Sequence, residues 1–199
     1  MAMTDKEAGK LRLKIKKIKE ALAADKRRCG GYYDDSHGLR YKPLQYYFKL
    51  ADFGGGLRYL RWFHKNFPDD IGYPDFLFEW TIMLFKTGKI KEAEKKAFET
   101  FCSNTYLFDK FFGRPVSPIE KWETSNLETA DFALNNFYYA SNQENLSDFA
   151  EWLDDLTRRE TFARLQNKYI DIYKRLFHER DHEIRGYLLK QAKQLENEL

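Results

Sequence analysis

The residues with the clearest capacity for chemistry lie near the C-terminus, where His178 and His182 flank Glu179. On a continuous helix, two histidines four residues apart share one face and could bind a zinc ion. The glutamate beside the first histidine could then activate a water molecule for hydrolysis. The sequence HERDH therefore raises the hypothesis of a zinc-dependent hydrolase.

This five-residue motif resembles the zinc-binding helix of metalloproteases. It departs from that pattern because its intervening positions, Arg180 and Asp181, are both charged. In a helix of about 100° per residue, His178 would also lie about 200° from the apolar Leu176. We therefore interpret the motif as exposed surface charge, and we expect no catalytic residue, no metal site and no cofactor. The hydrolase remains the second alternative function.

A second group of reactive side chains occupies residues 29–38, CGGYYDDSHG, which contain an aspartate, a serine and a histidine. Catalytic triads are recognised by spatial roles, and their members usually lie far apart in sequence. Cys29 and His37 have no second ligand pair at the spacing that a zinc site needs. The glycines and short polar residues predict a loop here.

The N-terminal 28 residues hold ten basic and four acidic residues, a local net charge of +6, whereas the whole chain carries +3. Leu11, Ile15, Ile18 and Leu22 recur at helical spacing and predict a basic amphipathic helix. Such a helix could contact phosphates or an anionic membrane surface, or its apolar stripe could dock on the rest of the protein. The candidate contacts to an anionic partner are Lys14, Lys16, Lys17, Lys19, Arg27 and Arg28.

Residues 74–104 predict two helices joined by a tight turn at Thr87-Gly88-Lys89. Apolar residues recur at helical spacing on both sides of the turn. Glycine at a helix end supplies the left-handed backbone conformation that closes the first helix. Such a hairpin must bury its apolar faces against neighbouring elements.

The segment LFKTGKIKEAEKKAF, residues 84–98, resembles the middle of a tetratricopeptide repeat, with Gly88 as the turn glycine and Ala93 at the helix crossing. Gly54 lies 34 residues before Gly88, which is the period of that family. The resemblance implies a peptide-binding groove made by the first helices of the repeats. The residues that it would place there are Asp75, Phe78, Ile82, Phe85 and Lys86. The alternative to a groove is that another helix covers these side chains, because large exposed apolar patches are uncommon.

The remaining segments predict further helices. A hairpin is expected at 41–67 with its turn at Gly54-Gly55-Gly56, and another at 125–157 with its turn at 141–143. Residues 105–124 contain two closely spaced prolines and predict an irregular segment. Residues 160–199 predict either one long bent helix or two helices that meet near the HERDH motif.

Composition sets the remaining expectations. The chain has 199 residues, of which 43% are hydrophobic, and two cysteines, which argues for a folded protein in a reducing compartment. We expect a cytoplasmic protein without a membrane span. The expected fold is all-α: stacked antiparallel hairpins in a TPR-like right-handed α-solenoid with long C-terminal helices. Residues 29–199 are expected to form a single domain, preceded by the basic helix at 1–28, which we call the arm. The expected function is non-enzymatic binding of a protein or peptide partner, and nucleic-acid or anionic-surface binding through the arm is the first alternative. Residues 160–199 carry two apolar stripes at helical spacing. The first is Phe162, Leu165, Tyr169, Ile172 and Leu176, and the second is Ile184, Leu188, Ala192, Leu195 and Leu199. The heptad-like first stripe permits a homo-oligomer and equally permits packing within one chain.

Overall fold

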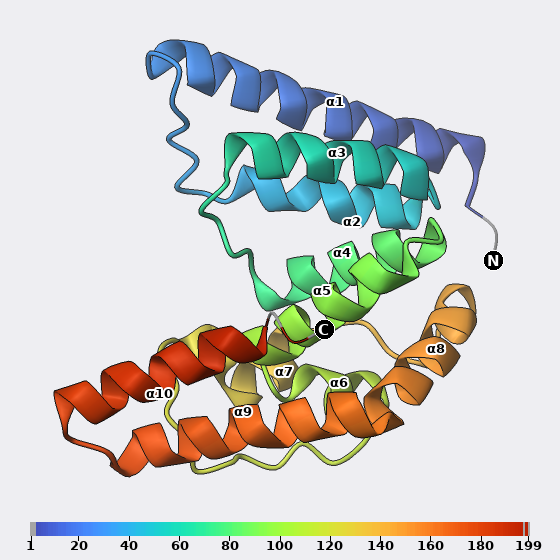
Figure 1. Cartoon of the computed structure of the whole chain (residues 1–199). Helices are drawn as coiled ribbons and strands as arrows, with labels where there is room; N and C mark the ends of the chain where they lie inside the picture. Colours follow the sequence, from blue (N-terminus) through green and yellow to red (C-terminus); the bar gives the residue numbers. More distant parts are fainter. Residues whose placement is uncertain (1–2, 197, 199) are drawn as a thin grey trace. The chain divides into compact units, whose positions relative to one another are not determined.

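The computed structural model describes residues 3–196 and residue 198, and this part of the chain is all-α, with helices and loops but no β-strand. It divides into two compact units, which are described separately. The N-terminal unit extends to Gly72 and the C-terminal unit begins at Tyr73. Figure 1 colours the first unit blue to teal and the second green to red.

The N-terminal unit contains three α-helices and one short 3-10 helix. They are α1 (Asp5–Arg28), η1 (Leu39–Tyr41), α2 (Lys42–Lys49) and α3 (Phe53–Asn66). Thr4 and Glu7 begin α1 with a reciprocal capping box, which satisfies backbone N–H groups at the helix start. Ala8, Ile15 and Leu22 are the buried residues of α1. The helix packs against α2, and the basic segment belongs to this unit.

The turn between α2 and α3 differs from the prediction. Gly54, Gly55 and Gly56 do not form the turn; they lie in the first turn of α3. The left-handed residue of the connection is Ala51, with φ of 51°. Asp52 then caps α3 by accepting a hydrogen bond from the Gly55 N–H at 2.8 Å. Asp52 supplies a helix start that the glycine pattern did not indicate.

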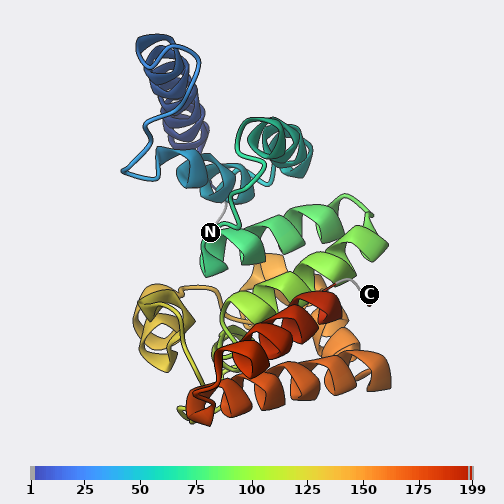
Figure 2. The same ribbon diagram turned by 60° about the vertical axis from the view of Figure 1, so that its left-hand side comes forward.

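The C-terminal unit contains seven α-helices among the described residues. They are α4 (Pro74–Lys86), α5 (Ile90–Ser103), α6 (Leu107–Phe111), α7 (Ala130–Asn136), α8 (Ser147–Arg158), α9 (Glu160–His178) and α10 (His182–Leu195). Two 3-10 helices, η2 (Asn126–Glu128) and η3 (Glu144–Leu146), precede α7 and α8. Figure 2 shows α9 and α10 side by side in orange and red, as they are in Figure 1.

The predicted hairpin at 74–104 is confirmed as α4 and α5. Gly88 adopts φ of 75° at the turn, and Lys89 N–H donates to the Leu84 carbonyl at 2.9 Å. Ala93 and Ala97 are fully buried, and the Thr81 and Thr100 hydroxyls share a hydrogen bond of 3.1 Å across the pair. Gly54 does not occupy a turn as Gly88 does, so these two glycines are not structurally equivalent. The TPR-like arrangement stays a prediction.

The hairpin predicted at 125–157 is only partly present. The helix expected at 127–141 is reduced to η2 and α7, because the chain continues in extended conformation from Phe137. Phe137 and Tyr139 point inward instead and are buried, with rings 4.9 and 5.5 Å from the ring of Phe78. The predicted irregular segment 105–124 also contains the short α6, because Leu107, Phe108 and Phe111 are buried.

At the C-terminus the structure has two helices rather than one bent helix. The predicted stripe of α9 is confirmed as core, since Phe162, Leu165, Tyr169, Ile172 and Leu176 are all buried. In the predicted stripe of α10, Leu188, Ala192 and Leu195 are buried, but Ile184 is exposed. Leu199 of this stripe lies outside the described residues.

The two cysteines have different environments. Cys29 is half-buried just after α1, while Cys102 is buried in α5. Burial raises the pKa of the Cys102 thiol well above its usual range.

Candidate functional site

A cleft of about 740 Å³ lies within the N-terminal unit, between α1 and α3. Both helices pack against α2, which separates them along this side; Figure 2 shows α1 in dark blue and α3 in teal on either side of the lighter blue α2. We call this hollow the basic cleft. The residues that line it are Lys19, Ala23, Lys26, Arg27, Gly31, Tyr33, Arg58, Tyr59, Trp62 and Asn66.

Aromatic rings form one part of the basic cleft. Tyr59 and Trp62 stack with ring centroids 5.2 Å apart, and the Tyr33 ring lies edge-on to Trp62 at 6.1 Å. Burial, with a smaller contribution from the charge of Asp35, raises the pKa of Tyr59 far above its usual value. Its hydroxyl donates to the Arg40 carbonyl oxygen at 2.5 Å. Tyr59 is therefore fixed and neutral at physiological pH, and it is only 1% exposed. The half-buried Tyr33 and Trp62 are the rings of the cleft that a ligand could reach.

Four cations surround these rings: Lys19, Lys26, Arg27 and Arg58. Lys19 Nζ donates to the Tyr47 hydroxyl and Lys26 Nζ donates to Asn66 Oδ1, each at 3.0 Å. Both of these acceptors are uncharged. Within the described part of the chain, none of the four cations forms an ion pair, and the lining contains no carboxylate. The positive charge of the basic cleft is therefore uncompensated.

A second hollow of about 260 Å³ adjoins the basic cleft; we call it the side hollow. The two share four lining residues: Lys26, Gly31, Tyr33 and Asn66. The side hollow adds Tyr32, Lys65 and Phe67. The combination of aromatic rings and cations thus continues past Tyr33, since the added residues are again two aromatic rings and a cation.

The loop at 29–38 shapes one end of this surface. Gly30 and Gly31 both have positive φ, and the Gly31 N–H donates back to the Lys26 carbonyl at 2.8 Å, which ends α1. Asp25 accepts the Asp34 N–H at 2.7 Å and pairs with Arg28 at 2.5 Å. These two interactions lower the pKa of Asp25. Its carboxylate therefore stays charged and fastens the loop to the helix.

Asp35 of this loop also has structural partners. Asp35 accepts the N–H groups of Leu39 and Arg40 at 2.8 Å each and also pairs with Arg40. Arg40 in turn pairs with Asp70 at 2.6 Å. The aspartates thus cap η1 and bind the loop together, in agreement with the predicted loop.

Of the six residues predicted to contact an anionic partner, two line the basic cleft: Lys19 and Arg27. Lys16 pairs with Glu20 at 3.9 Å, and Arg28 pairs with Asp25 and Asp34. Lys14 lies over the Tyr46 ring at 5.6 Å, and Lys17 is exposed but lines neither hollow. The basic surface is therefore narrower on α1 than the sequence suggested.

Sequence reasoning missed the other half of the basic cleft, on α3. The signal was present in residues 57–66, LRYLRWFHKN, where basic and aromatic residues alternate. Arg58, Tyr59 and Trp62 come from this stretch. Basic residues interleaved with aromatic ones are typical of nucleic-acid surfaces.

The peptide groove predicted from the TPR resemblance is not an open surface. Phe78 and Ile82 have 0% exposure, and the Phe85 ring packs on Phe149 and Trp152. Lys86 pairs with Asp148 of α8 at 2.5 Å. Asp75 is half-buried, and that burial raises its pKa. The prediction of an exposed groove at these residues is wrong, because α8 and the extended segment after α7 cover this face.

The HERDH motif does not lie on one helix. His178 ends α9 and His182 begins α10, and Glu179–Asp181 between them are not helical. Asp181 caps α10 by accepting the N–H groups of Glu183 and Ile184. The geometry that the zinc motif requires is therefore absent. The described residues contain no group of three or more side chains placed to hold a metal ion.

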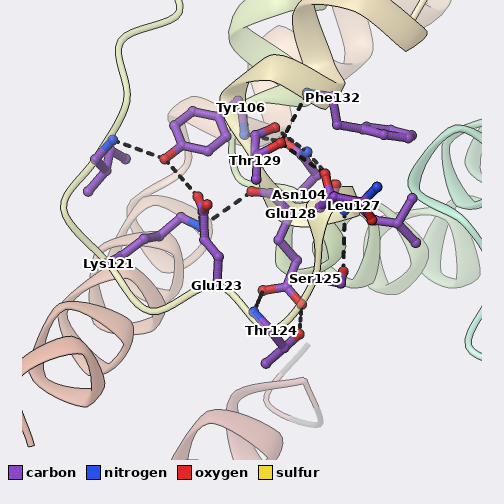
Figure 3. A network of polar contacts seen from close by, with 12 residues as sticks. Asn104, Tyr106, Lys121, Glu123, Thr124, Ser125, Leu127, Glu128, Thr129 and Phe132 are labelled. Atoms are coloured by element: carbon purple, nitrogen blue, oxygen red, sulfur yellow. Dashed lines mark hydrogen bonds and ion pairs between the residues drawn. The ribbon is translucent and has the colours of Figure 1, made fainter.

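A buried polar cluster in the C-terminal unit is the other concentration of reactive side chains (Figure 3). Lys121, 5% exposed, pairs with Glu123 at 3.0 Å and lies over the Tyr106 ring. Asn104 donates to the carbonyls of Leu127 and Thr129. These side chains bind one another and the backbone, so the cluster fastens the segment before α7 to the core.

Among the described residues, no helix is long and apolar enough to cross a bilayer. Comparison with protein families, curated proteins and solved structures finds nothing that matches this chain.

Proposed function

We propose that the protein binds nucleic acid, without catalysing a reaction, through the basic cleft of its N-terminal unit. The single observation that carries this proposal is the set of four cations without ion pairs around the half-buried rings of Tyr33 and Trp62. Lysine and arginine bind phosphates, and the aromatic rings offer surfaces to the bases.

The distribution of charge supports a polyanionic partner. Residues 1–72 hold 16 lysines and arginines against 9 aspartates and glutamates, a net charge of +7. The other 127 residues hold 18 against 22, a net charge of −4. The attraction is thus concentrated in the unit that contains the basic cleft.

A membrane surface fits the basic cleft less well than a nucleic acid does. Helices that lie on bilayers insert a protruding apolar face. Here the apolar stripe of α1 is turned toward α2, with Ile15 and Leu22 buried. The half-buried rings of Tyr33 and Trp62 line a cleft and do not form a protruding apolar face, so they suit a flexible chain better than a bilayer.

Equilibrium binding of a fluorescent single-stranded oligonucleotide of about 12 nucleotides tests this function. Between about 50 and 200 mM salt, three or four phosphate contacts give a slope of log K against log salt of about −2 to −3. Arg58→Gln should weaken binding about 5-fold and reduce the slope by about 0.7. Arg61→Gln is the matched control, because Arg61 is exposed on the same helix but lines neither hollow.

A second pair of variants adds charge without removing a contact. Ala23 lines the basic cleft and is exposed, whereas its neighbour Ala24 is exposed and does not line it. Ala23→Glu should weaken binding more than Ala24→Glu. Equal effects of the two variants, or tight binding to phosphatidylserine vesicles with none to the oligonucleotide, would contradict the proposal.

Protein binding remains a second candidate function, and α10 is the observation that favours it. Ile184 and Tyr187 lie one turn apart and are 43% and 60% exposed. A second copy of this chain is the simplest occupant of this face. Sedimentation should then show a concentration-dependent dimer that Tyr187→Lys abolishes, and a monomer at every concentration would exclude it.

A further inference from the structure

We infer that the basic cleft takes unstacked bases of a single strand, so that the protein distinguishes single-stranded nucleic acid from a duplex. This inference rests on the proposed function and narrows its ligand. It follows from the size of the basic cleft and from its uncharged polar groups, which already form hydrogen bonds within the protein.

The size of the basic cleft suits nucleotides and not a duplex. A volume of about 740 Å³ lies in the range of pockets that enclose small organic ligands. The bases of a duplex are stacked on one another, and only their edges are reachable from the grooves. A duplex could contact the cations at the rim, but it could not bring a base face to Trp62.

Rings and cations alternate within the basic cleft at contact distance. Lys19 Nζ lies 5.7 Å from the Tyr59 ring centroid, and Lys26 Nζ lies 5.0 Å from that of Tyr33. Because Tyr59 is only 1% exposed, the half-buried Tyr33 and Trp62 are the rings that a base could meet. A strand whose bases meet the rings therefore passes its phosphates close to ammonium groups. This is the arrangement by which single strands are bound with little dependence on sequence.

The side hollow extends this path beyond one nucleotide. Tyr32 is 79% exposed, and Lys65 and Phe67 line the side hollow with it. Because the two hollows share Tyr33 and Lys26, a strand leaving the basic cleft meets a further ring and a further cation.

The uncharged polar side chains position this surface instead of reading base edges. Asn66 Oδ1 accepts from Lys26 and from the Tyr33 hydroxyl at 3.1 Å, and its Nδ2 donates to the Trp62 carbonyl at 2.8 Å. The Tyr59 hydroxyl is engaged with Arg40. We therefore expect homopolymeric strands of different bases to bind within about 10-fold of each other.

The decisive experiment compares three ligands of equal length on the full chain: a single strand, the matching duplex, and an abasic strand with the same phosphates. The single strand should bind about 10- to 100-fold more tightly than the abasic strand, because each stacked base adds affinity. It should also bind more tightly than the duplex. Equal affinity for the single and abasic strands would overturn the inference while leaving phosphate binding intact. Failure of all three ligands to bind would instead overturn the proposed function.

The fluorescence of Trp62 provides a second test, which does not require a variant that loses many contacts to the strand. Trp62 is the one tryptophan of residues 1–72; the others are Trp80, Trp122 and Trp152. Adding the single strand should quench tryptophan fluorescence in the unaltered protein and in Trp122→Phe, but not in Trp62→Phe. Trp62→Phe keeps a stacking ring and should bind nearly as well, whereas Trp62→Leu should lose about 5- to 100-fold. Quenching that persists in Trp62→Phe would contradict base contact at this position.

Discussion

Lys16 and Lys19 lie on the same helix, one turn apart, and have the same side chain, yet their surroundings give them different roles. Lys16 forms an exposed ion pair with Glu20 at 3.9 Å, whereas Lys19 donates to the Tyr47 hydroxyl and lines the basic cleft. A surface ion pair contributes little stability, but it removes a cation from the charge available to a ligand. At the scale of the residue, the contacts of each lysine determine whether its charge is available to a ligand. Its position in a basic stretch of sequence matters less.

Gly54 and Gly55 allow a matched test at this scale. A Cβ on Gly55 would lie 2.2 to 2.8 Å from the carboxyl atoms of Asp52, while one on Gly54 would meet only Arg58 at 3.6 Å. Gly55→Ala should displace the Asp52 cap and lower the free energy of unfolding by about 1 to 2 kcal/mol. Gly54→Ala should leave it unchanged or raise it by up to about 1 kcal/mol, because alanine favours a helix more than glycine does.

Urea unfolding followed by circular dichroism measures both variants. If Gly55→Ala were as stable as Gly54→Ala, the position of the Asp52 cap would be wrong.

At the scale of the element, the connection between α9 and α10 depends on Asp181. Its carboxylate satisfies two N–H groups at the start of α10, so Asp181→Ala should cost about 1 kcal/mol. His178→Ala and His182→Ala should change the free energy of unfolding by less than about 0.5 kcal/mol, because both histidines are exposed. A larger loss for either histidine, or zinc retained by the purified protein and lost in these variants, would revive the metal site.

The ion pair between Lys86 and Asp148 links α4 to α8 and predicts a dependence on pH. Partial burial opposes ionisation of Asp148, but hydrogen bonds from Lys86 and from the Phe149 N–H outweigh it and lower its pKa. A carboxyl whose folded pKa is lowered contributes stability above its unfolded pKa of about 4 and loses it as the pH falls through the folded value.

Asp148→Asn should therefore reduce the free energy of unfolding at neutral pH. The loss should be small, about 0.5 kcal/mol, because Asp148 is 57% exposed and solvent screens the pair. Once the pH has fallen below the folded pKa of Asp148, the variant and the unaltered protein should unfold alike. Asp171→Asn, at an exposed position on α9, is the control in the same urea titrations. A difference between the Asp148 variant and the unaltered protein that persists in acid would exclude this ion pair as its cause.

Local sequence pattern predicted some of the elements but not which other segments cover them. The turn at Gly88 and the stripe of α9 could be predicted because both depend on residues close in sequence. The burial of Phe78 could not, since it depends on Phe137 and Phe149, which lie far along the chain. For the same reason, the sequence predicted only the α1 side of the basic cleft. Its other side comes from α3, which lies far from α1 in sequence.

At the scale of the whole molecule, the two units should differ in binding as they do in charge. A fragment of residues 3–72 contains the unit with the basic cleft. A fragment of residues 73–199 contains the unit with an excess of acidic residues. The first fragment should retain binding of the single strand within about 10-fold of the full chain, provided that circular dichroism shows it helical. The second should not bind. Binding by residues 73–199 alone would place the nucleic-acid surface elsewhere.

Because Cys29 and Cys102 differ in burial, Cys29 can be labelled selectively. Cys102 is buried and its thiol resists ionisation, so an alkylating dye should react with Cys29. Cys29 lies two residues before Gly31, which lines both hollows. A fluorophore attached there would report on an arriving strand in real time, and the association rate of the natural sequence could be followed without an engineered label site.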